Sequence, residues 1–155
     1  MLKIGVISDT HGLLRPEAQR CLSGVAHLIH AGDIGSADVI DRLRRIAPVT
    51  AIRGNIDVGS WAHDYPETQT VRLGSRSFYN LHYRKQLNQR PAPDGIDAVI
   101  SGHSHVAQVE AVDGVLYLNP GSAGPRRFRL PITVATLDLD EGGKLQPVIH
   151  RLTVR

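Results

Sequence analysis

Two patterns of apolar and polar positions divide the chain. Over residues 1–53, short apolar runs alternate with stretches in which apolar residues recur every three or four positions. Short apolar runs are typical of buried strands, and the wider spacing is typical of amphipathic helices. The pattern predicts strands at 2–8, 25–31 and 49–53 and helices at 16–23 and 36–47. This order of strands and helices favours a parallel sheet.

After residue 66 the pattern changes to alternation around glycine-containing turns. Antiparallel hairpins are predicted at 68–82, 106–119 and 132–154, the second of them around Asp113-Gly114. Residues 97–102 read as a further buried strand, and 86–95 as a short helix or a loop. No linker, repeat or low-complexity tract interrupts residues 1–155. We therefore expect a single α/β domain in which two sheets of mixed type pack together with helices outside.

Polar side chains follow five of the predicted strands, at the point where each strand ends. They are Asp9, His11, Asp33, Asn55, His82, His103 and His105. From Asp9 to His103 the five strand ends are spaced by 24, 22, 27 and 21 residues, which is about one strand and one return element each. Because ligands bind at the carboxyl ends of strands in open α/β sheets, we expect these side chains to meet at one edge.

Each of these residues alone has an ordinary structural explanation. Asp33 can cap a helix, Asn55 can form a turn, and His82 can be a core or surface histidine. His103 and His105 are more informative, because residues two apart lie on one side of an extended backbone. Seven clustered ligand-type side chains exceed one tetrahedral zinc site and suit two metals bridged by a carboxylate. Imidazole, carboxylate and amide groups without thiolate indicate Mn, Fe, Zn or similar ions, and paired metals suit in-line displacement at phosphorus.

The motifs Asp-Thr-His (9–11), Gly-Asp (32–33), Gly-Asn (54–55) and Gly-His-Ser-His (102–105), with His82 between them, resemble the calcineurin-like metallophosphoesterases. The resemblance continues through Asn-Pro-Gly-Ser (119–122) and is strongest to the small bacterial and archaeal phosphodiesterases. It implies a four-layer α/β/β/α sandwich of two mixed β-sheets flanked by helices. It also implies a metal-dependent phosphoesterase, in the first place a phosphodiesterase, that uses a metal-bridging hydroxide for in-line attack on phosphorus.

The resemblance also implies a division of the ligands between two divalent metal ions. The first ion would be held by Asp9, His11 and His105, and the second by Asn55, His82 and His103, with Asp33 bridging both. Mn²⁺ is the favoured ion, with Fe, Zn, Ni and Co as the alternatives.

The chain departs from the family pattern at two positions. Ile56 stands where many relatives have the histidine that protonates the leaving group, so the general acid is unknown and we expect a preference for good leaving groups such as aryl esters. Tyr83 stands where relatives usually have glycine. It would either reshape the mouth of the pocket or move His82 away from a ligand position.

Several residues remain open between two roles. Asp57 can orient a histidine or form a turn, and His30 can support the ligands or fill the core. Segment 56–66, which contains Trp61, can be a lid or can fold back onto the core. Ser122 reads as a turn residue rather than a nucleophile. Two further groups have alternatives without a ligand role: His27, His63 and His150 as structural or solvated residues, and Arg126, Arg127 and Arg129 as a solvated basic loop or a grip for a second phosphate.

The net charge and the cysteine content limit which binding partners and which cellular compartment can be expected. A formal net charge of +3 suits a small phosphodiester or nucleotide-like substrate but is too weak to predict nucleic-acid binding. Cys21 is the only cysteine, so no intrachain disulfide can form and a reducing compartment is expected. We find no signal peptide and no membrane span, and therefore expect a cytoplasmic protein with no membrane partner. A homo-oligomer is compatible with the sequence.

Two other functions remain alternatives to the phosphodiesterase. The first is a phosphomonoesterase acting on nucleotides. The second is a non-catalytic protein-binding scaffold, because the retromer complex contains a scaffold subunit with the fold that the resemblance implies.

Overall fold

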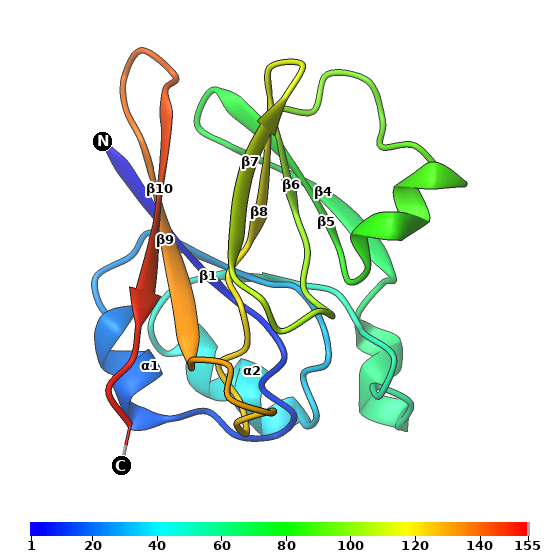
Figure 1. Cartoon of the computed structure of the whole chain (residues 1–155), viewed down its shortest axis with the longest axis vertical. Coiled ribbons are helices and arrows are strands. Elements are labelled where there is room, and N and C mark those ends of the chain that lie inside the picture. Colours follow the sequence, from blue (N-terminus) through cyan, green and yellow to red (C-terminus); the bar gives the residue numbers. More distant parts are fainter. Residues whose placement is uncertain (155) are drawn as a thin grey trace.

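Two five-stranded sheets packed face to face form the computed structural model, which describes residues 1–154 (Figure 1). In spatial order the first sheet contains β10 (Leu145–Arg151), β9 (Thr133–Leu139), β1 (Leu2–Ile7), β2 (His27–His30) and β3 (Val49–Ala51). Strands β1, β2 and β3 run parallel, and β9 pairs antiparallel with both β1 and β10. The expected parallel start of the chain is therefore confirmed, and the final hairpin completes the same sheet.

The second sheet also contains both parallel and antiparallel strand pairs. In spatial order it contains β4 (Thr68–Leu73), β5 (Arg76–Leu81), β6 (Ala98–Ile100), β8 (Val115–Asn119) and β7 (Gln108–Val112). Strands β5, β6 and β8 are parallel, and the edge strands β4 and β7 are antiparallel to their neighbours. The predicted hairpins 68–82 and 106–119 are both present.

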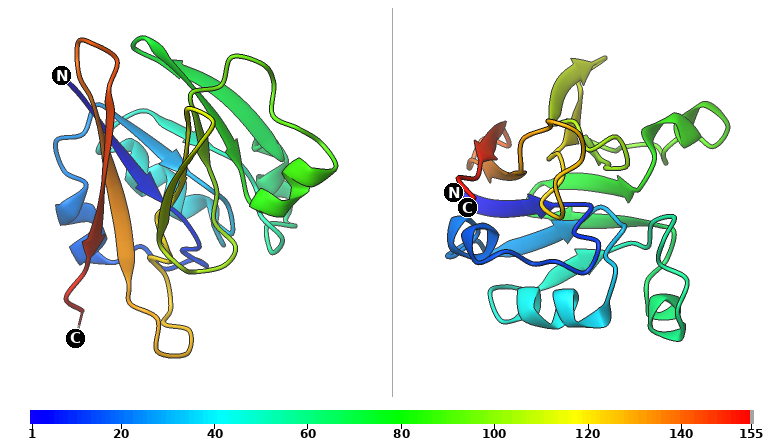
Figure 2. Two further views of the ribbon diagram at one scale, coloured as in Figure 1. Left: turned by 45° about the horizontal axis from the view of Figure 1, so that its top comes forward. Right: turned by 60° about the horizontal axis from the view of Figure 1, so that its bottom comes forward.

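Helices lie mainly on the outer face of the first sheet (Figure 2). Helices α1 (Pro16–Cys21) and α2 (Ala37–Arg44) pack there against a core that includes Leu22, Ile40 and Leu43. Over the outer face of the second sheet lies the short 3-10 helix η2 (Arg84–Asn88), which contacts Tyr117 of β8. The predicted α/β sandwich is confirmed, with this second helical layer reduced to η2 in the described residues. Neither α-helix in residues 1–154 is long and apolar enough to cross a membrane.

A second core lies between the two sheets and fixes their relative position. Ile4, Val6 and Ile29 of the first sheet meet Phe78 and Ile100 of the second, and all five side chains are fully buried. This burial follows from the period of two in each strand, which sends alternate side chains to the same face. The two sheets therefore present their carboxyl strand ends at one common end of the sandwich.

The segment 56–66 folds back onto the core. It contains the 3-10 helix η1 (Ser60–Asp64), and its Ala62 and Tyr65 are buried. Trp61 is half-buried and packs against the core between the first sheet and helices α1 and α2. Its ring lies edge-on to the ring of Tyr65. Of the two roles left open by the sequence, the structure supports folding back rather than a free lid.

Candidate metal centre

The backbone at the predicted site is strained in a way that ordinary loops avoid. Five of the seven predicted ligands have a positive φ: Asp9 (56°), His11 (48°), Asp33 (53°), His103 (73°) and His105 (64°). A left-handed conformation costs a residue other than glycine roughly 1–2 kcal/mol. Such strain is typical of functional sites, where surrounding structure holds side chains in required directions.

Three glycines let the loops approach one another closely. Gly32 has a φ of 98°, and an added Cβ would lie 2.7 Å from Nδ1 of His82. A Cβ on Gly54 would overlap the Asp33 carboxylate, and one on Gly102 would lie 2.6 Å from Oδ2 of Asp9. These positions exclude any side chain, so the strand ends converge on the carboxylates.

Asp9 has one carboxylate oxygen held by the protein and one left free. Oδ2 accepts hydrogen bonds from the Ser8 hydroxyl at 2.6 Å and from the His103 backbone N–H at 3.2 Å. Oδ1 is buried and makes no hydrogen bond to any described residue, although Nε2 of His105 lies 3.3 Å away. The free oxygen therefore faces imidazole nitrogens.

Asp33 is arranged in the same way. Its Oδ1 accepts a hydrogen bond from the Ile56 backbone N–H at 3.1 Å. Its Oδ2 lies 3.6 Å from Nε2 of His11 and 3.3 Å from Nε2 of His82. The same two imidazole nitrogens each lie 3.9 Å from Oδ1 of Asp9. His11 and His82 thus stand between the free oxygens of two carboxylates.

A backbone carbonyl fixes the tautomer of His82. Nδ1 of His82 lies 2.7 Å from the Ala31 carbonyl oxygen, which can only accept, so Nδ1 carries the hydrogen. In the neutral ring Nε2 then carries a lone pair that points toward carboxylate oxygens. Nε2 has no hydrogen-bond partner among the described residues. Acceptors that face each other in a buried site repel unless a cation lies between them. A positive species between Nε2 of His82 and the carboxylate oxygens would therefore remove this repulsion.

The charges at the site are consistent with this requirement. Burial alone would raise the pKa of Asp33, but His82, the Ile56 N–H and His11 hold it at about 2. Burial also opposes ionisation of Asp9, yet the neighbouring imidazole of His105, the hydrogen bond from Ser8 and the charge of His82 hold its pKa below the usual value. Burial tends to lower the pKa of His82, and the neighbouring carboxylates raise it overall. Both carboxylates are therefore ionised and create a negative field that attracts cations.

Two groups of side chains have the spacing of metal ligands. In the first, Asp9, His11 and His105 offer atoms within 4.8 Å of one another, and in the second Asp9, Asp33 and His82 do the same.

His103 lies beside the second group, with its ring centroid 5.3 Å from that of His82. Asn55 is exposed in the turn whose next residue, Ile56, binds Asp33. The structure therefore brings five of the seven predicted residues into two ligand groups, with His103 next to the second group and Asn55 in the neighbouring turn.

Tyr83 does not displace His82 from the site. The Tyr83 ring packs against the His103 ring at an interplanar angle of 43°, with ring centroids 4.3 Å apart. His82 keeps its position between Asp9 and Asp33. Of the two consequences considered from the sequence, the structure favours a reshaped pocket over a displaced histidine.

Supporting residues that the sequence left open now have defined contacts. The buried carboxylate of Asp57 accepts backbone N–H bonds from Ile34, Gly35 and Gly54, and so joins two loops of the site. The sequence pattern does not indicate Ser8 as a site residue, apart from its position directly before Asp9. Ser122 donates to the Asp9 carbonyl oxygen, which agrees with a turn role.

His30 supports the site from within the core. Its Nδ1 accepts from the Gly32 N–H, so Nε2 donates to the Thr10 hydroxyl at 3.0 Å, and Thr10 in turn donates to the Ile34 carbonyl. This chain of bonds ties β2 to the loops that carry Asp9 and Asp33. Burial lowers the pKa of His30 to about 4. His30 is therefore neutral and has both of the roles considered from the sequence: it fills the core, and it supports the ligand loops.

The remaining polar residues lie outside both ligand groups. His27 and His150 bond threonine hydroxyls, His63 is exposed, and Arg126 donates to the Leu130 carbonyl in an exposed loop. The structural interpretation of these histidines is confirmed.

The sequence is similar to those of proteins described as probable metallophosphoesterases or phosphodiesterases. A family model described as the calcineurin-like phosphoesterase superfamily domain matches residues 2–142. A probable metallophosphoesterase of Methanothermobacter thermautotrophicus is 33% identical, over 96% of this chain and 91% of that protein. A phosphodiesterase of Methanocaldococcus jannaschii is 30% identical, over 90% of this chain and 95% of its own length.

Solved structures show the same fold. An archaeal phosphodiesterase superposes with a TM-score of 0.77 at 28% identity, covering 96% of this chain and all of that one. Vps29 of Chaetomium thermophilum reaches 0.74 at 20% identity, covering 98% and 97%, and this likeness shows the fold alone. With a family match over residues 2–142 and a full-length relative at 33% identity, the chain belongs to the calcineurin-like phosphoesterase superfamily.

Proposed function

We propose that this chain is a phosphodiesterase that binds two divalent metal ions at the common end of its sheets. The observation that carries the proposal is the set of buried, unpartnered ligand atoms Asp9 Oδ1, His11 Nε2 and His82 Nε2, with Nε2 of His105 3.3 Å from Asp9 Oδ1. Unpartnered buried polar atoms are rare and costly, and clustered acceptor atoms of this type fit a cation. The donor set contains nitrogen and oxygen only, which suits Mn²⁺ first and Fe, Zn, Ni or Co as alternatives.

The protein's own contribution is to hold these atoms in place. Asp9, His11 and His105 would hold one ion, Asn55, His82 and His103 the other, and Asp33 would bridge them. Ser8 and the His103 N–H fix the Asp9 carboxylate through Oδ2, and the Ile56 N–H fixes Asp33 through Oδ1, so one oxygen of each is free for metal. The Ala31 carbonyl accepts from Nδ1 of His82, so that in the neutral ring Nε2 is the nitrogen that would bind metal.

A bound metal pair would supply a hydroxide nucleophile at neutral pH and neutralise charge on the phosphoryl oxygens. The side chain at position 56 cannot donate a proton to the leaving group, because Ile56 is apolar. It is 45% exposed. General acid catalysis contributes roughly 10²–10⁴-fold. We therefore expect aryl phosphodiesters to be hydrolysed faster than alkyl phosphodiesters by a factor of this order.

Position 56 provides its own test. Ile56→His should raise the rate on an alkyl diester and leave a smaller gap to the aryl diester. Val58→His is the matched control, since Val58 lies on the same exposed stretch and is 80% exposed. Equal rates of the wild type on aryl and alkyl diesters would contradict the reasoning.

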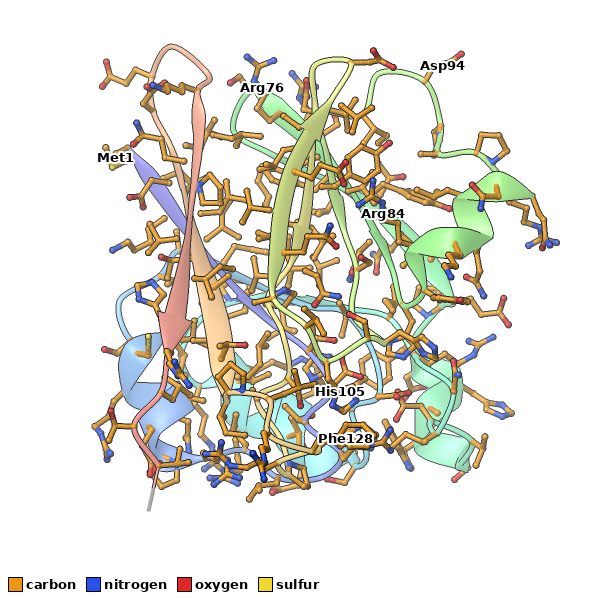
Figure 3. All side chains as sticks on the ribbon, viewed as in Figure 1. Met1, Arg76, Arg84, Asp94, His105 and Phe128 are labelled. Carbon is orange, nitrogen blue, oxygen red and sulfur yellow. The ribbon has the colours of Figure 1, made fainter. Side chains whose placement is uncertain are left out.

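The function itself is tested with bis(p-nitrophenyl) phosphate and p-nitrophenyl phosphate, after chelation and again after restoring Mn²⁺. We expect metal-dependent turnover that is faster for the diester. Asp33→Ala should abolish turnover and weaken Mn²⁺ binding measured by calorimetry. Asp94→Ala, which removes an exposed carboxylate at the opposite end of the molecule (Figure 3), should change neither.

Two outcomes would redirect the assignment. Faster turnover of the monoester would favour the phosphomonoesterase alternative. Mn²⁺ binding without turnover of either ester would favour a protein-binding scaffold. The observation that supports this second candidate is the apolar side chain of Ile56.

A further inference from the structure

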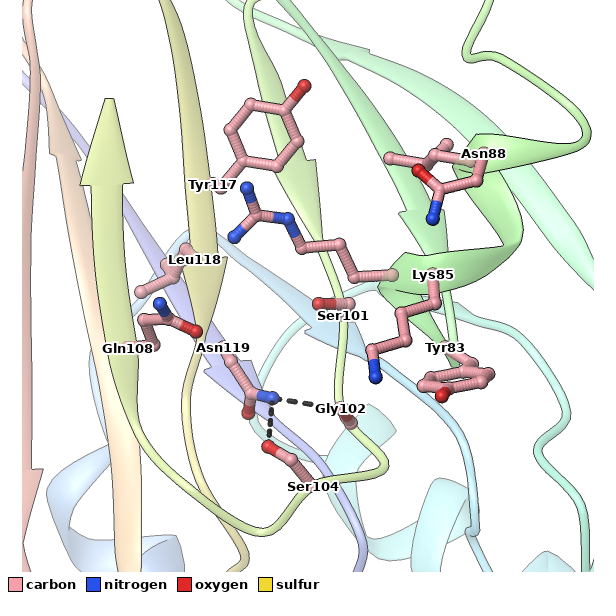
Figure 4. Close-up of a pocket in the computed structure, with 12 residues that line it drawn as sticks. Tyr83, Lys85, Asn88, Ser101, Gly102, Ser104, Gln108, Tyr117, Leu118 and Asn119 are labelled. Carbon is pink, nitrogen blue, oxygen red and sulfur yellow. Dashed lines mark hydrogen bonds between the residues drawn. The ribbon is translucent and has the colours of Figure 1, made fainter. Parts of the chain in front are cut away.

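A cavity of about 470 Å³ lies beside the candidate metal centre, on the outer face of the second sheet (Figure 4). Its size is in the range of roughly 300–1,000 Å³ that is typical of small-molecule sites. One wall comes from η2 and includes Lys85 and Asn88. The opposite wall comes from β7 and β8 and includes Gln108 and Tyr117. Nothing in the proposed metal chemistry requires this cavity.

The cavity and the metal centre share a boundary at His103. Gly102 and Ser104, on either side of His103, line the cavity, and so does Tyr83, whose ring contacts the His103 ring. Asn119 donates from Nδ2 to the Gly102 carbonyl at 2.9 Å and to the Ser104 hydroxyl at 3.1 Å, as the dashed lines in Figure 4 show. These bonds hold the loop that separates the two spaces. The cavity and the metal centre therefore lie on either side of the short loop 102–104.

The cavity contains a planar cation that is already fixed in position. The Arg84 guanidinium lies 4.1 Å from the centre of the Tyr117 ring and forms an ion pair with Glu110 at 2.7 Å. Guanidinium groups stack on planar rings, and a side chain that is held in advance loses less entropy on binding. Arg84 therefore provides a platform for a flat ring.

The other polar groups indicate what kind of ring fits. Within residues 1–154 no acidic group lies within ion-pair distance of Lys85, so its three N–H donors remain available. Asn88 and Gln108 add amide groups that both donate and accept. A nucleobase offers a planar ring with carbonyl and ring-nitrogen acceptors, whereas a plain aryl or alkyl group offers no such acceptors.

We propose that this cavity binds the nucleoside of a phosphodiester substrate whose phosphorus lies at the metal centre. The inference rests on the proposed phosphodiesterase function and names its substrate class. Arg84 stacks on the base, and Lys85 donates to its acceptors. Glu110 is a positioning residue that acts through Arg84.

The test compares two diesters with one leaving group, thymidine 5′-(p-nitrophenyl phosphate) and methyl p-nitrophenyl phosphate, both with Mn²⁺. We expect the wild type to have a KM for the thymidine ester that is lower by roughly ten-fold, the size of a base-stacking contribution. Arg84→Leu should remove most of this difference, and Arg84→Lys should remove it as well because the charge stays and the plane is lost. Arg45→Leu, an exposed arginine at the end of α2, should keep it.

The outcomes separate this inference from the proposed function. Hydrolysis of both esters with equal KM by the wild type would overturn the nucleoside site and leave the phosphodiesterase intact. An equal rise in KM for both esters in Arg84→Leu, or full retention of the difference in Arg84→Lys, would also overturn it. If neither ester is hydrolysed, the proposed function fails, and calorimetry with the intact thymidine ester then decides: binding that weakens in Arg84→Leu supports the site, and no binding overturns it.

Discussion

Replacing Asp57 by asparagine is the sharpest test of how the site is held together. Asp57 is 3% exposed, and no metal group includes it. Its Oδ2 accepts from Ile34 N at 3.0 Å and Gly54 N at 2.8 Å, and its Oδ1 accepts from Gly35 N at 2.9 Å. One carboxylate thus joins the loop after β2, which carries Asp33, to the loop after β3.

The size of the effect follows from these three bonds. Asparagine at position 57 keeps one acceptor oxygen, which can retain the two bonds of Oδ2. Its NH₂ group would then face the Gly35 N–H, so two donors oppose each other in a buried place. Losing one bond to a charged acceptor and leaving a buried donor unpaired costs about 2–4 kcal/mol together. For a chain of this length, a loss of about 3 kcal/mol corresponds to a drop in Tm of roughly 6–12 °C.

Urea unfolding and Mn²⁺ calorimetry measure the two consequences separately. We expect the lower free energy of unfolding together with a roughly 10–100-fold weaker Mn²⁺ affinity at a temperature where the variant is folded, as is typical when support of metal ligands is lost. Asp113→Asn, in the exposed β7–β8 turn, is the matched control. A variant within 1 kcal/mol of the wild type that binds Mn²⁺ equally well would refute the idea that Asp57 positions the ligand loops.

Three further predictions concern stability. The pKa of His30 is about 4 in the folded chain and about 6.5 when exposed, so the unfolded state takes up its proton first as pH falls. Metal-free protein should therefore lose up to about 3 kcal/mol between pH 6.5 and 4 in urea titrations, and an equal loss in His30→Gln would contradict this origin. Gly102→Ala places a Cβ against Ser8 and Asp9, so both Tm and Mn²⁺ affinity should fall, and an unchanged Mn²⁺ affinity would disprove the close approach. Mn²⁺ at one hundred times its Kd should stabilise the wild type by about 2.7 kcal/mol, and thermal scans with a chelator that show no change would argue against a metal centre.

The order of strands and helices was readable from the sequence because it depends on local periods. Alternation of period two and spacing of three to four residues are properties of neighbouring positions. The hairpin at Asp113-Gly114 is also local, since Asp113 and Gly114 both take the positive φ that a tight turn requires. The predicted boundaries were a few residues too wide, as in α2, which ends at Arg44 rather than at 47.

The convergence of Asp9, Asp33 and the histidines was also predictable, because parallel strands end at one edge. What the sequence left undecided was which oxygen of each carboxylate is free, and this depends on Ser8 and the backbone of His103 and Ile56. The tautomer of His82 depends in the same way on the Ala31 carbonyl, 51 positions away in the chain.

The sequence by itself therefore determined the class of fold, the edge of the sheets where chemistry is concentrated and the residue types gathered there. Only the tertiary structure decided the direction of each ligand atom, the role of Asp57 and the cavity between η2 and β8. The physical reason is range: strand period and turn chemistry act between neighbours, whereas hydrogen-bond partners and cavity walls come from loops that meet only when the two sheets pack.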